Sequence, residues 1–324
     1  MENILTINNL TISFKKNLKV VKKINIKIPA GKTVAIVGES GSGKTLSALS
    51  ILKLLPTNAK INEGEIIYKE KNLLKIPNYQ MEKIRGNKIT TIFQEPMSSL
   101  NPLHNIKKQI NEIITNHSDI SEKEATEKTK ILLNYVGLDY LTDRINSYPF
   151  ELSGGQRQRV MIAMAIANNP DLLIADEPTT ALDVTIQLQI LELLKKLQKK
   201  LNMAILFISH DLGVVKNLAD YVYIMKDGNI IEHNSKFNIF NNPIKKYTQE
   251  LINTKTLKRE KIKERKNLLM KIDKLKVWYP IKKGLLKKTV NYVKAINSIS
   301  FDLYENQTIG IVGESGSGKT SLAL

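Results

Sequence analysis

The chain has 324 residues, a formal net charge of +18, no cysteine and 42% hydrophobic residues. This length allows one large domain or two ordinary ones, with ample material for a core. The lack of cysteine excludes disulfides, thiolate zinc sites and iron–sulfur clusters. Lysine is abundant along the whole chain rather than in one patch, so we attribute the charge mainly to composition and expect no nucleic acid partner. No apolar run is long enough to cross a bilayer, so we expect membrane contact only through a partner protein or surface charge.

Apolar and polar residues alternate through 4–27, which predicts edge strands of a sheet. The next apolar run, Val34–Val37, leads into the glycine-rich segment Gly38–Thr45, and 46–55 has helical character. Strand, glycine-rich turn, Lys-Thr and helix make a phosphate-binding loop, because glycines let backbone N–H groups surround an anion that the helix N-terminus also attracts. In this loop Lys44 can reach the β and γ phosphates of a nucleoside triphosphate, and the Thr45 hydroxyl can hold Mg²⁺. The predicted phosphate contacts are Gly38, Ser40, Gly41, Gly43, Lys44 and Thr45.

A helical insertion is predicted in the middle of the chain. Residues 64–68 and 89–93 have strand character, and 95–152 then has helical character. The clearest helix signals are a capping box, Ser121 with Glu124, and an apolar face, Ile131, Leu132 and Val136. We therefore expect a helical subdomain inserted into an α/β core.

Short apolar strands alternate with helices in the residues that follow. Residues 172–175 and 204–208 are wholly apolar, and 186–201 between them has a helical pattern. This alternation predicts a parallel sheet. An Asp-Gly pair separates 222–225 from Ile230 and Ile231, which predicts a hairpin.

Polar side chains at the strand ends supply candidate catalytic groups. Asp176 is the predicted Mg²⁺ partner together with Thr45, and Glu177 is the predicted general base that polarises the attacking water. Gln94 can contact the metal or the water, and His210 can donate to the γ-phosphate. Each of these residue types is by itself more often structural, so the assignment depends on its position at a strand end after a phosphate-binding loop.

A second anion-binding turn opens another helix. Ser153, Gly154, Gly155 and Gln156 form a Ser-Gly-Gly turn at a helix N-terminus, which attracts anions. One γ-phosphate does not need two such turns from the same core. We therefore expect this turn to serve a nucleotide held by another copy.

The beginning of the chain is repeated near its end, which indicates a tandem duplication. Three segments recur in the same order: 10–14 as 275–279, 24–28 as 299–303, and 38–45 as 313–320. The second copy carries an insertion, which we place around 281–290.

The match also assigns residues of the second copy. Tyr279 corresponds to Phe14, which could stack on an adenine ring or belong to the core. The chain reaches Leu324 without a second Ser-Gly-Gly turn, acidic strand end or late histidine, so we expect a fragment of a repeat. The predicted phosphate contacts of this copy are Gly313, Gly316, Gly318, Lys319 and Thr320.

Together these motifs resemble the full ordered set of an ATP-binding-cassette (ABC) ATPase, over the whole chain but with only the opening of a second cassette. The matching segments are Gly38–Thr45, Gln94, Leu152–Gln156, Leu173–Glu177, Ala181–Asp183 and His210. In that family two cassettes sandwich two ATP molecules, each between one phosphate loop and the opposite signature turn. The resemblance implies a P-loop NTPase core with an antiparallel β subdomain at its edge and an inserted α-helical signature subdomain. It also assigns Asp183 to the D-loop.

Further segments resemble the oligopeptide, dipeptide and nickel importer branch. These are Phe93–Met97, Ser99–Pro102, Ala175–Asp183, Asn242-Pro243 and Tyr247–Gln249. Asn101–His104 and Tyr279–Gly284 are most similar to the double-cassette ATPases of microcin C and peptide importers. Lys246 departs from the pattern, because the branch usually has His-Pro before the tyrosine.

The resemblance implies a cassette at 1–250, a basic linker at 251–271 and the start of a second cassette at 272–324. It further implies ATP hydrolysis that powers peptide import through separate permease subunits, at the cytoplasmic face of the inner membrane, with a solute-binding protein as an indirect partner. The groove between Gln94 and the helical subdomain would receive a permease helix. The alternatives are a soluble ABC-type ATPase acting on nucleic acid or ribosomes, and an inactive fragment.

Overall fold

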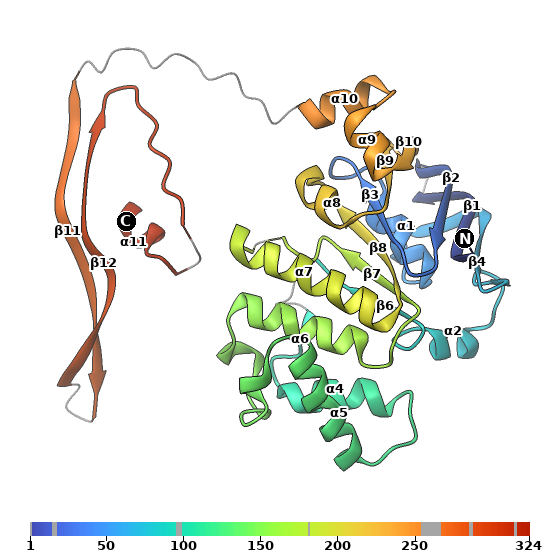
Figure 1. The fold of residues 1–324 in the computed structure, drawn as a ribbon, viewed down its shortest axis with the longest axis horizontal. Coiled ribbons are helices and arrows are strands. Elements are labelled where there is room, and N and C mark those ends of the chain that lie inside the picture. The colour runs from blue at the N-terminus through green and yellow to red at the C-terminus, as the bar shows by residue number, and fades with distance from the viewer. Residues whose placement is uncertain are drawn as a thin grey trace. The chain divides into compact units, whose positions relative to one another are not determined.

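The computed structural model describes residues 2–14, 18–94, 99–180, 182–253, 267–284, 288–313 and 316–324. Most of the expected linker, residues 95–97 of the importer-branch motif, Ala181 of the D-loop motif and 285–287 of the insertion lie outside these ranges. The chain forms two units, Met1–Thr180 with Leu188–Lys255, and Ala181–Gln187 with Thr256–Leu324 (Figure 1).

The first unit begins with an antiparallel sheet in the strand order β2-β1-β4-β5. Ile7 of β1 pairs with Ile26 of β2, and Leu10 with Ile24, with bulges between these pairs. The prediction of strands over 4–27 is therefore confirmed, but only β2 lies at an edge of this sheet, because β1 pairs with both β2 and β4. The strands of this sheet are β1 (Asn3–Phe14), β2 (Leu18–Pro29), β4 (Ala59–Tyr68) and β5 (Lys71–Asn72).

The second sheet of this unit has the order β10-β9-β3-β8-β7-β6, and all its neighbours are parallel except β10 and β9. Every residue of β3, β7 and β8 is buried, as expected for a sheet covered on both faces. The β9–β10 hairpin turns at Asp227 and Gly228, both with positive φ, as the Asp-Gly pair predicts. The strands are β3 (Thr33–Val37), β6 (Ile89–Ile92), β7 (Leu172–Asp176), β8 (Ala204–Ser209), β9 (Tyr221–Lys226) and β10 (Asn229–Ser235).

The predicted helical insertion lies between β6 and β7. Its helices are α4 (Ile106–Thr115), α5 (Glu122–Tyr135), η2 (Asp139–Leu141), η3 (Pro149–Glu151) and α6 (Gly154–Ile166). The Ser121–Glu124 capping box is present. Of the predicted apolar face, Leu132 and Val136 are buried, but Ile131 is 50% exposed and Leu133 is buried instead. The buried positions of α5 follow the 3.6-residue helical period through Leu132, Leu133 and Val136.

The remaining helices of the first unit follow its strands. They are α1 (Lys44–Ile51), α2 (Asn78–Ile84), α7 (Val184–Leu201), α8 (Leu212–Leu218), α9 (Lys236–Asn241) and α10 (Lys246–Asn253). The helix expected over 46–55 begins earlier and ends earlier, because Lys53 takes a positive φ of 52° that a right-handed helix does not allow. No helix among the described residues is both long and apolar enough to cross a membrane.

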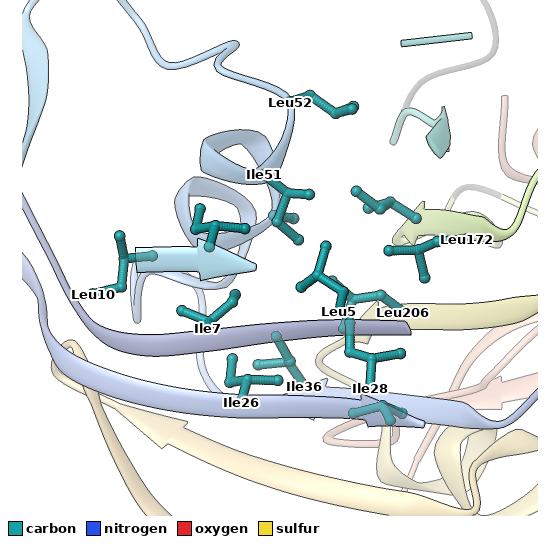
Figure 2. Packing of buried hydrophobic residues seen from close by; sticks show 14 of the residues in the cluster. Leu5, Ile7, Leu10, Ile26, Ile28, Ile36, Ile51, Leu52, Leu172 and Leu206 are labelled. Atoms are coloured by element: carbon teal, nitrogen blue, oxygen red, sulfur yellow. The ribbon is translucent and has the colours of Figure 1, made fainter. Parts of the chain in front are cut away.

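The main core lies between the antiparallel sheet, α1 and the parallel strands (Figure 2). Leu5 and Ile7 of β1, Ile36 of β3, Ile51 of α1 and Leu206 of β8 are fully buried there. Burying such a side chain contributes roughly 1.5–3 kcal/mol. This packing holds β3 and α1 together, and with them the turn that joins the two elements.

The second unit repeats the first hairpin. It contains β11 (Leu268–Lys283), β12 (Lys288–Tyr304) and α11 (Lys319–Ala323). Leu275 pairs with Ile299 and Tyr279 with Val293, as Leu10 pairs with Ile24 and Phe14 with Leu18 in the first copy. The bulge residues Lys274 and Ser298 take positive φ, as do Asn9 and Lys23 at the matching places. The described residues of the insertion, 281–284 and 288–290, lie at the far end of this longer hairpin.

One strand of the first copy has no counterpart in the described part of the second. Residues 309–312, which match β3 in sequence, have no regular structure, and Val312 is 92% exposed. In the first copy β3 pairs with both β8 and β9. The described part of the second unit contains no strands equivalent to these two, so the backbone N–H and C=O groups of 309–312 have no strand partners.

Candidate nucleotide-binding site

The turn between β3 and α1 requires glycine at several places. Gly43 has φ of +101°, and a Cβ there would lie 2.8 Å from the Val20 carbonyl oxygen. A Cβ at Gly38 would lie 2.0 Å from the Met225 carbonyl oxygen. At Gly41, with φ of +79°, a Cβ would meet nothing within 4 Å. The loop is therefore packed tightly against β2 and β9 on one side and open at Gly41, as a cradle for an anion would be.

Lys44 lies beneath this loop as its cationic group. Its Nζ donates to the carbonyl oxygens of Gly38 and Glu39, both at 2.8 Å. Burial lowers the pKa of Lys44, although the nearby carboxylates of Glu177 and Asp176 favour its charged form. The buried Ser42 hydroxyl has no hydrogen-bond partner among the described residues. A buried cation and an unpartnered hydroxyl fit a phosphate group.

Asp176 and Thr45 approach each other beside Lys44. Asp176 is the buried last residue of β7, and the Thr45 hydroxyl donates to its Oδ1 at 3.3 Å. Burial raises the pKa of the Asp176 carboxyl, and the Thr45 hydrogen bond and the Lys44 charge offset this only in part. A hydroxyl and a carboxylate are oxygen ligands of the kind that Mg²⁺ prefers, so the two residues fit that ion.

Three strand ends meet at the Glu177 carboxylate. Gln94 Nε2, beyond β6, donates to Glu177 Oε2 at 3.1 Å. Nδ1 of His210, beyond β8, lies 3.1 Å from Glu177 Oε1. The structure therefore brings together the three residues that were predicted as catalytic. The sequence did not point to Thr180, whose hydroxyl donates to Glu177 Oε2 at 3.0 Å. The only feature of the sequence that could have indicated Thr180 is its position, three residues after the candidate base.

The Ser-Gly-Gly turn lies at the start of α6. The Ser153 hydroxyl accepts from the Gln156 N–H, and Gln156 Oε1 accepts from the Ser153 N–H at 2.8 Å, which completes a capping box. Gln156 also donates to the Tyr140 hydroxyl at 2.7 Å. Gly154 and Gly155 are the first residues of the helix. Among the described residues, this turn shares no hydrogen bond with the loop at 38–45.

Three further predicted residues lie elsewhere. Asp183 Oδ1 accepts from the Ile186 N–H at 2.9 Å, at the start of α7. Phe14 is the half-buried last residue of β1, and Tyr279 is exposed in β11.

The second copy reproduces the turn of the first. Lys319 Nζ donates to the Gly313 carbonyl oxygen at 2.9 Å, as Lys44 does to that of Gly38. Gly318 has φ of +90°, and a Cβ there would lie 2.2 Å from the Ala295 carbonyl oxygen. Gly316 is open, as Gly41 is. The turn therefore forms from its own residues and the adjacent β12, without the parallel sheet.

Comparison with known proteins agrees with the nucleotide-binding geometry described above. Residues 21–180 match the family described as ABC transporter. The chain is 47% identical to the peptidoglycan transport ATP-binding protein YejF of Agrobacterium fabrum, over 99% of this chain and 60% of that protein. It is also 47% identical to the oligopeptide transport ATP-binding protein OppD of Bacillus subtilis, over 77% of this chain and 71% of that protein. The chain thus spans less than two thirds of YejF.

Solved structures agree. The dimeric, post-hydrolysis state of the ATP-binding cassette MJ0796, bound to ADP and phosphate, is similar with a TM-score of 0.64 and 30% identity, over 72% of this chain and 98% of that one. The similarity thus extends from sequence to the arrangement of the two sheets and the helical insertion. The chain belongs to the ABC transporter family of ATP-binding proteins.

Proposed function

We propose that this chain is an ATP-hydrolysing subunit of a peptide importer, with residues 1–250 as one complete cassette. The convergence of Gln94, Glu177 and His210 beside the loop that holds Lys44 is the observation that carries this proposal. The relatives named above are a peptidoglycan and an oligopeptide transport protein, which supports a peptide as the solute.

In the proposed mechanism the 38–45 loop and Lys44 bind the β and γ phosphates, and Phe14 stacks on the adenine. Thr45, Asp176 and Gln94 would hold Mg²⁺, which would neutralise charge on the phosphate oxygens. Glu177 accepts a proton from the attacking water, since its carboxylate is held in place by neighbouring side chains. His210 donates to the γ-phosphate.

A second cassette would complete the site. The Ser153–Gln156 turn and Asp183 would face a nucleotide bound by that cassette, while its own signature turn would face the nucleotide at Lys44. The loop at 313–320 and Tyr279 would bind ATP in the same way once the rest of their cassette is present.

The membrane partner would dock in the groove between β6 and the helical insertion. A cavity of about 310 Å³ lies there, lined by apolar side chains such as Phe93, Ile113 and Met161. An apolar cavity of this size accepts side chains from a short helix. We therefore place a permease helix in it, at the cytoplasmic face of the membrane, with a solute-binding protein acting on the other side.

Two substitutions test the ATPase assignment. Glu177→Gln keeps the shape of the side chain but cannot accept the proton, so ATP binding should remain while turnover falls about 100-fold or more. Lys44→Ala should weaken ATP binding itself, as measured by calorimetric titration. Unchanged hydrolysis in Glu177→Gln would refute the base. Co-purification with ribosomes instead of permeases would refute the transport role.

A further inference from the structure

The phosphate loop carries an acidic residue at its open side. Glu39 follows Gly38, is exposed, and its carbonyl oxygen accepts a hydrogen bond from Lys44. A nucleoside triphosphate at this loop would bring several negative charges close to the Glu39 carboxylate. Like charges at such distances repel, so the direction in which Glu39 points affects how well the loop binds phosphate.

Tyr247 of α10 holds the Glu39 side chain. Its hydroxyl donates to Glu39 Oε1 at 3.2 Å, across 208 residues of sequence. The Lys226 ammonium lies 4.4 Å from the centre of the Tyr247 ring. Burial and the Glu39 charge both raise the pKa of the Tyr247 hydroxyl, so it remains a donor.

The position of Tyr247 is fixed by the strand before it. Glu232 of β10 is buried, and its two carboxylate oxygens accept from the N–H groups of Ile244 at 2.9 Å and Lys245 at 3.0 Å. These bonds anchor the chain immediately before α10. They place the Tyr247 ring beside Lys226, at the end of β9.

The β9–β10 hairpin touches the same loop a second time. The Gly228 N–H donates to the Ser42 carbonyl oxygen at 3.1 Å, and the Gly228 carbonyl oxygen accepts from the Lys22 N–H at 2.8 Å. The hairpin and α10 therefore both contact the loop, the hairpin at Ser42 and α10 at Glu39. Tyr247 is the part of this support that reaches a charged side chain of the loop.

We propose that Tyr247 is a positioning residue for nucleotide binding, whose hydroxyl holds the Glu39 carboxylate away from the phosphates. This inference rests on the proposed binding of ATP at the 38–45 loop. In the absence of the tyrosine hydroxyl, Glu39 would turn freely and repel the triphosphate. Nucleotide affinity would fall, while the groups around Glu177 would be unchanged.

Tyr247→Phe tests this because it removes only the hydroxyl and keeps the ring against Lys226. We expect KM and Kd for Mg-ATP to rise roughly 3- to 10-fold, the range for loss of a typical intramolecular hydrogen bond, with kcat within about twofold. Glu39→Gln in the Tyr247→Phe background should restore wild-type affinity. Tyr79→Phe is the matched control, because Tyr79 is exposed and its hydroxyl accepts only from neighbouring Gln80 among the described residues.

The possible failures are distinguishable. If wild-type chain binds no Mg-ATP, the proposed function fails. If wild type binds, Lys44→Ala does not and Tyr247→Phe is unchanged, only the role of Tyr247 fails. A loss in Tyr247→Phe that persists with Glu39→Gln would also overturn it, because the effect would then not act through the carboxylate.

Discussion

At Glu177 the backbone has φ of +46°, a conformation that costs a non-glycine residue on the order of 1 kcal/mol. The strain is held by the bond from its N–H to the Ile208 carbonyl oxygen at 3.0 Å, and by the partners of its carboxylate. This backbone conformation lets one side chain meet groups from both neighbouring strand ends. The strain coincides with the residue to which we assign the proton transfer.

Asp176 and Asp171 lie at the two ends of β7. Removing the charge of each should change the stability of the fold in opposite directions. Burial raises the pKa of Asp176, so its charged form destabilises the nucleotide-free fold. Burial also acts on Asp171, but hydrogen bonds from Lys69 and Tyr68 outweigh it and lower the pKa. Asp176→Asn should therefore raise the melting temperature of the nucleotide-free protein by a few degrees, about 1 kcal/mol, and Asp171→Asn should lower it.

The same pKa directions set the pH dependence. The stabilisation that Asp176 contributes to the fold is fully present below its unfolded-state pKa of about 3.9. It is lost as pH rises through the higher pKa of the folded state. The stabilisation that Asp171 contributes is present above the unfolded-state pKa and is lost as pH falls through the lower pKa of the folded state. Thermal melting at acidic and neutral pH measures both, and Mg-ATP should no longer stabilise Asp176→Asn. Equal responses of the two variants would contradict the assignment.

At the scale of elements, the β9–β10 hairpin supports the phosphate loop. Substitution of two glycines, Gly228 in the hairpin and Gly41 in the loop, can distinguish this structural support from nucleotide binding. Gly228 has φ of +81°, and a Cβ there would lie 2.6 Å from the Val20 carbonyl oxygen. Gly41 has φ of +79° but open space around it. Gly228→Ala should lower the free energy of unfolding by roughly 2–3 kcal/mol through strain and overlap, and Gly41→Ala by about 1 kcal/mol through strain alone. Denaturant unfolding measures both.

Nucleotide titration gives the complementary measurement. Because a Cβ at Gly41 points into the open side of the loop, Gly41→Ala should weaken ATP binding more strongly than it weakens the fold. A larger loss of stability in Gly41→Ala than in Gly228→Ala would show that the hairpin does not press on the loop as described.

Most elements could be predicted because each follows a local pattern. The wholly apolar runs at 172–175 and 204–208 became β7 and β8, and Gly38–Thr45 became the turn. Local patterns did not predict structure that depends on residues distant in the sequence. Residues 309–312 match β3 but form no strand. The contacts of Thr180 with Glu177 and of Tyr247 with Glu39 form only when the chain folds. No sequence motif connects Tyr247 with a loop residue 208 positions before it.

At the scale of the whole chain, two copies of one segment differ in what surrounds them. Ile24 is buried in β2, whereas the matching Ile299 is 38% exposed in β12. Leu5 is likewise buried, and the matching Met270 is exposed. The second hairpin keeps the register of the first although these matching side chains are exposed among the described residues. Of the two phosphate loops, only the first lies beside an acidic strand end within the described residues.

Because the Ser153–Gln156 turn makes no hydrogen bond with the loop at 38–45 among the described residues, we expect the ATP-bound state to need a second cassette. Light scattering of Glu177→Gln with ATP should show a dimer, which a monomer under the same conditions would contradict. Ser153→Glu in this background should prevent it, because the new carboxylate would repel the γ-phosphate of the partner. Ser121→Glu is the matched control, since Ser121 also completes an exposed capping box, on α5. Both should lose about 1 kcal/mol of stability, but only Ser153→Glu should remain monomeric, because only that cap faces a phosphate.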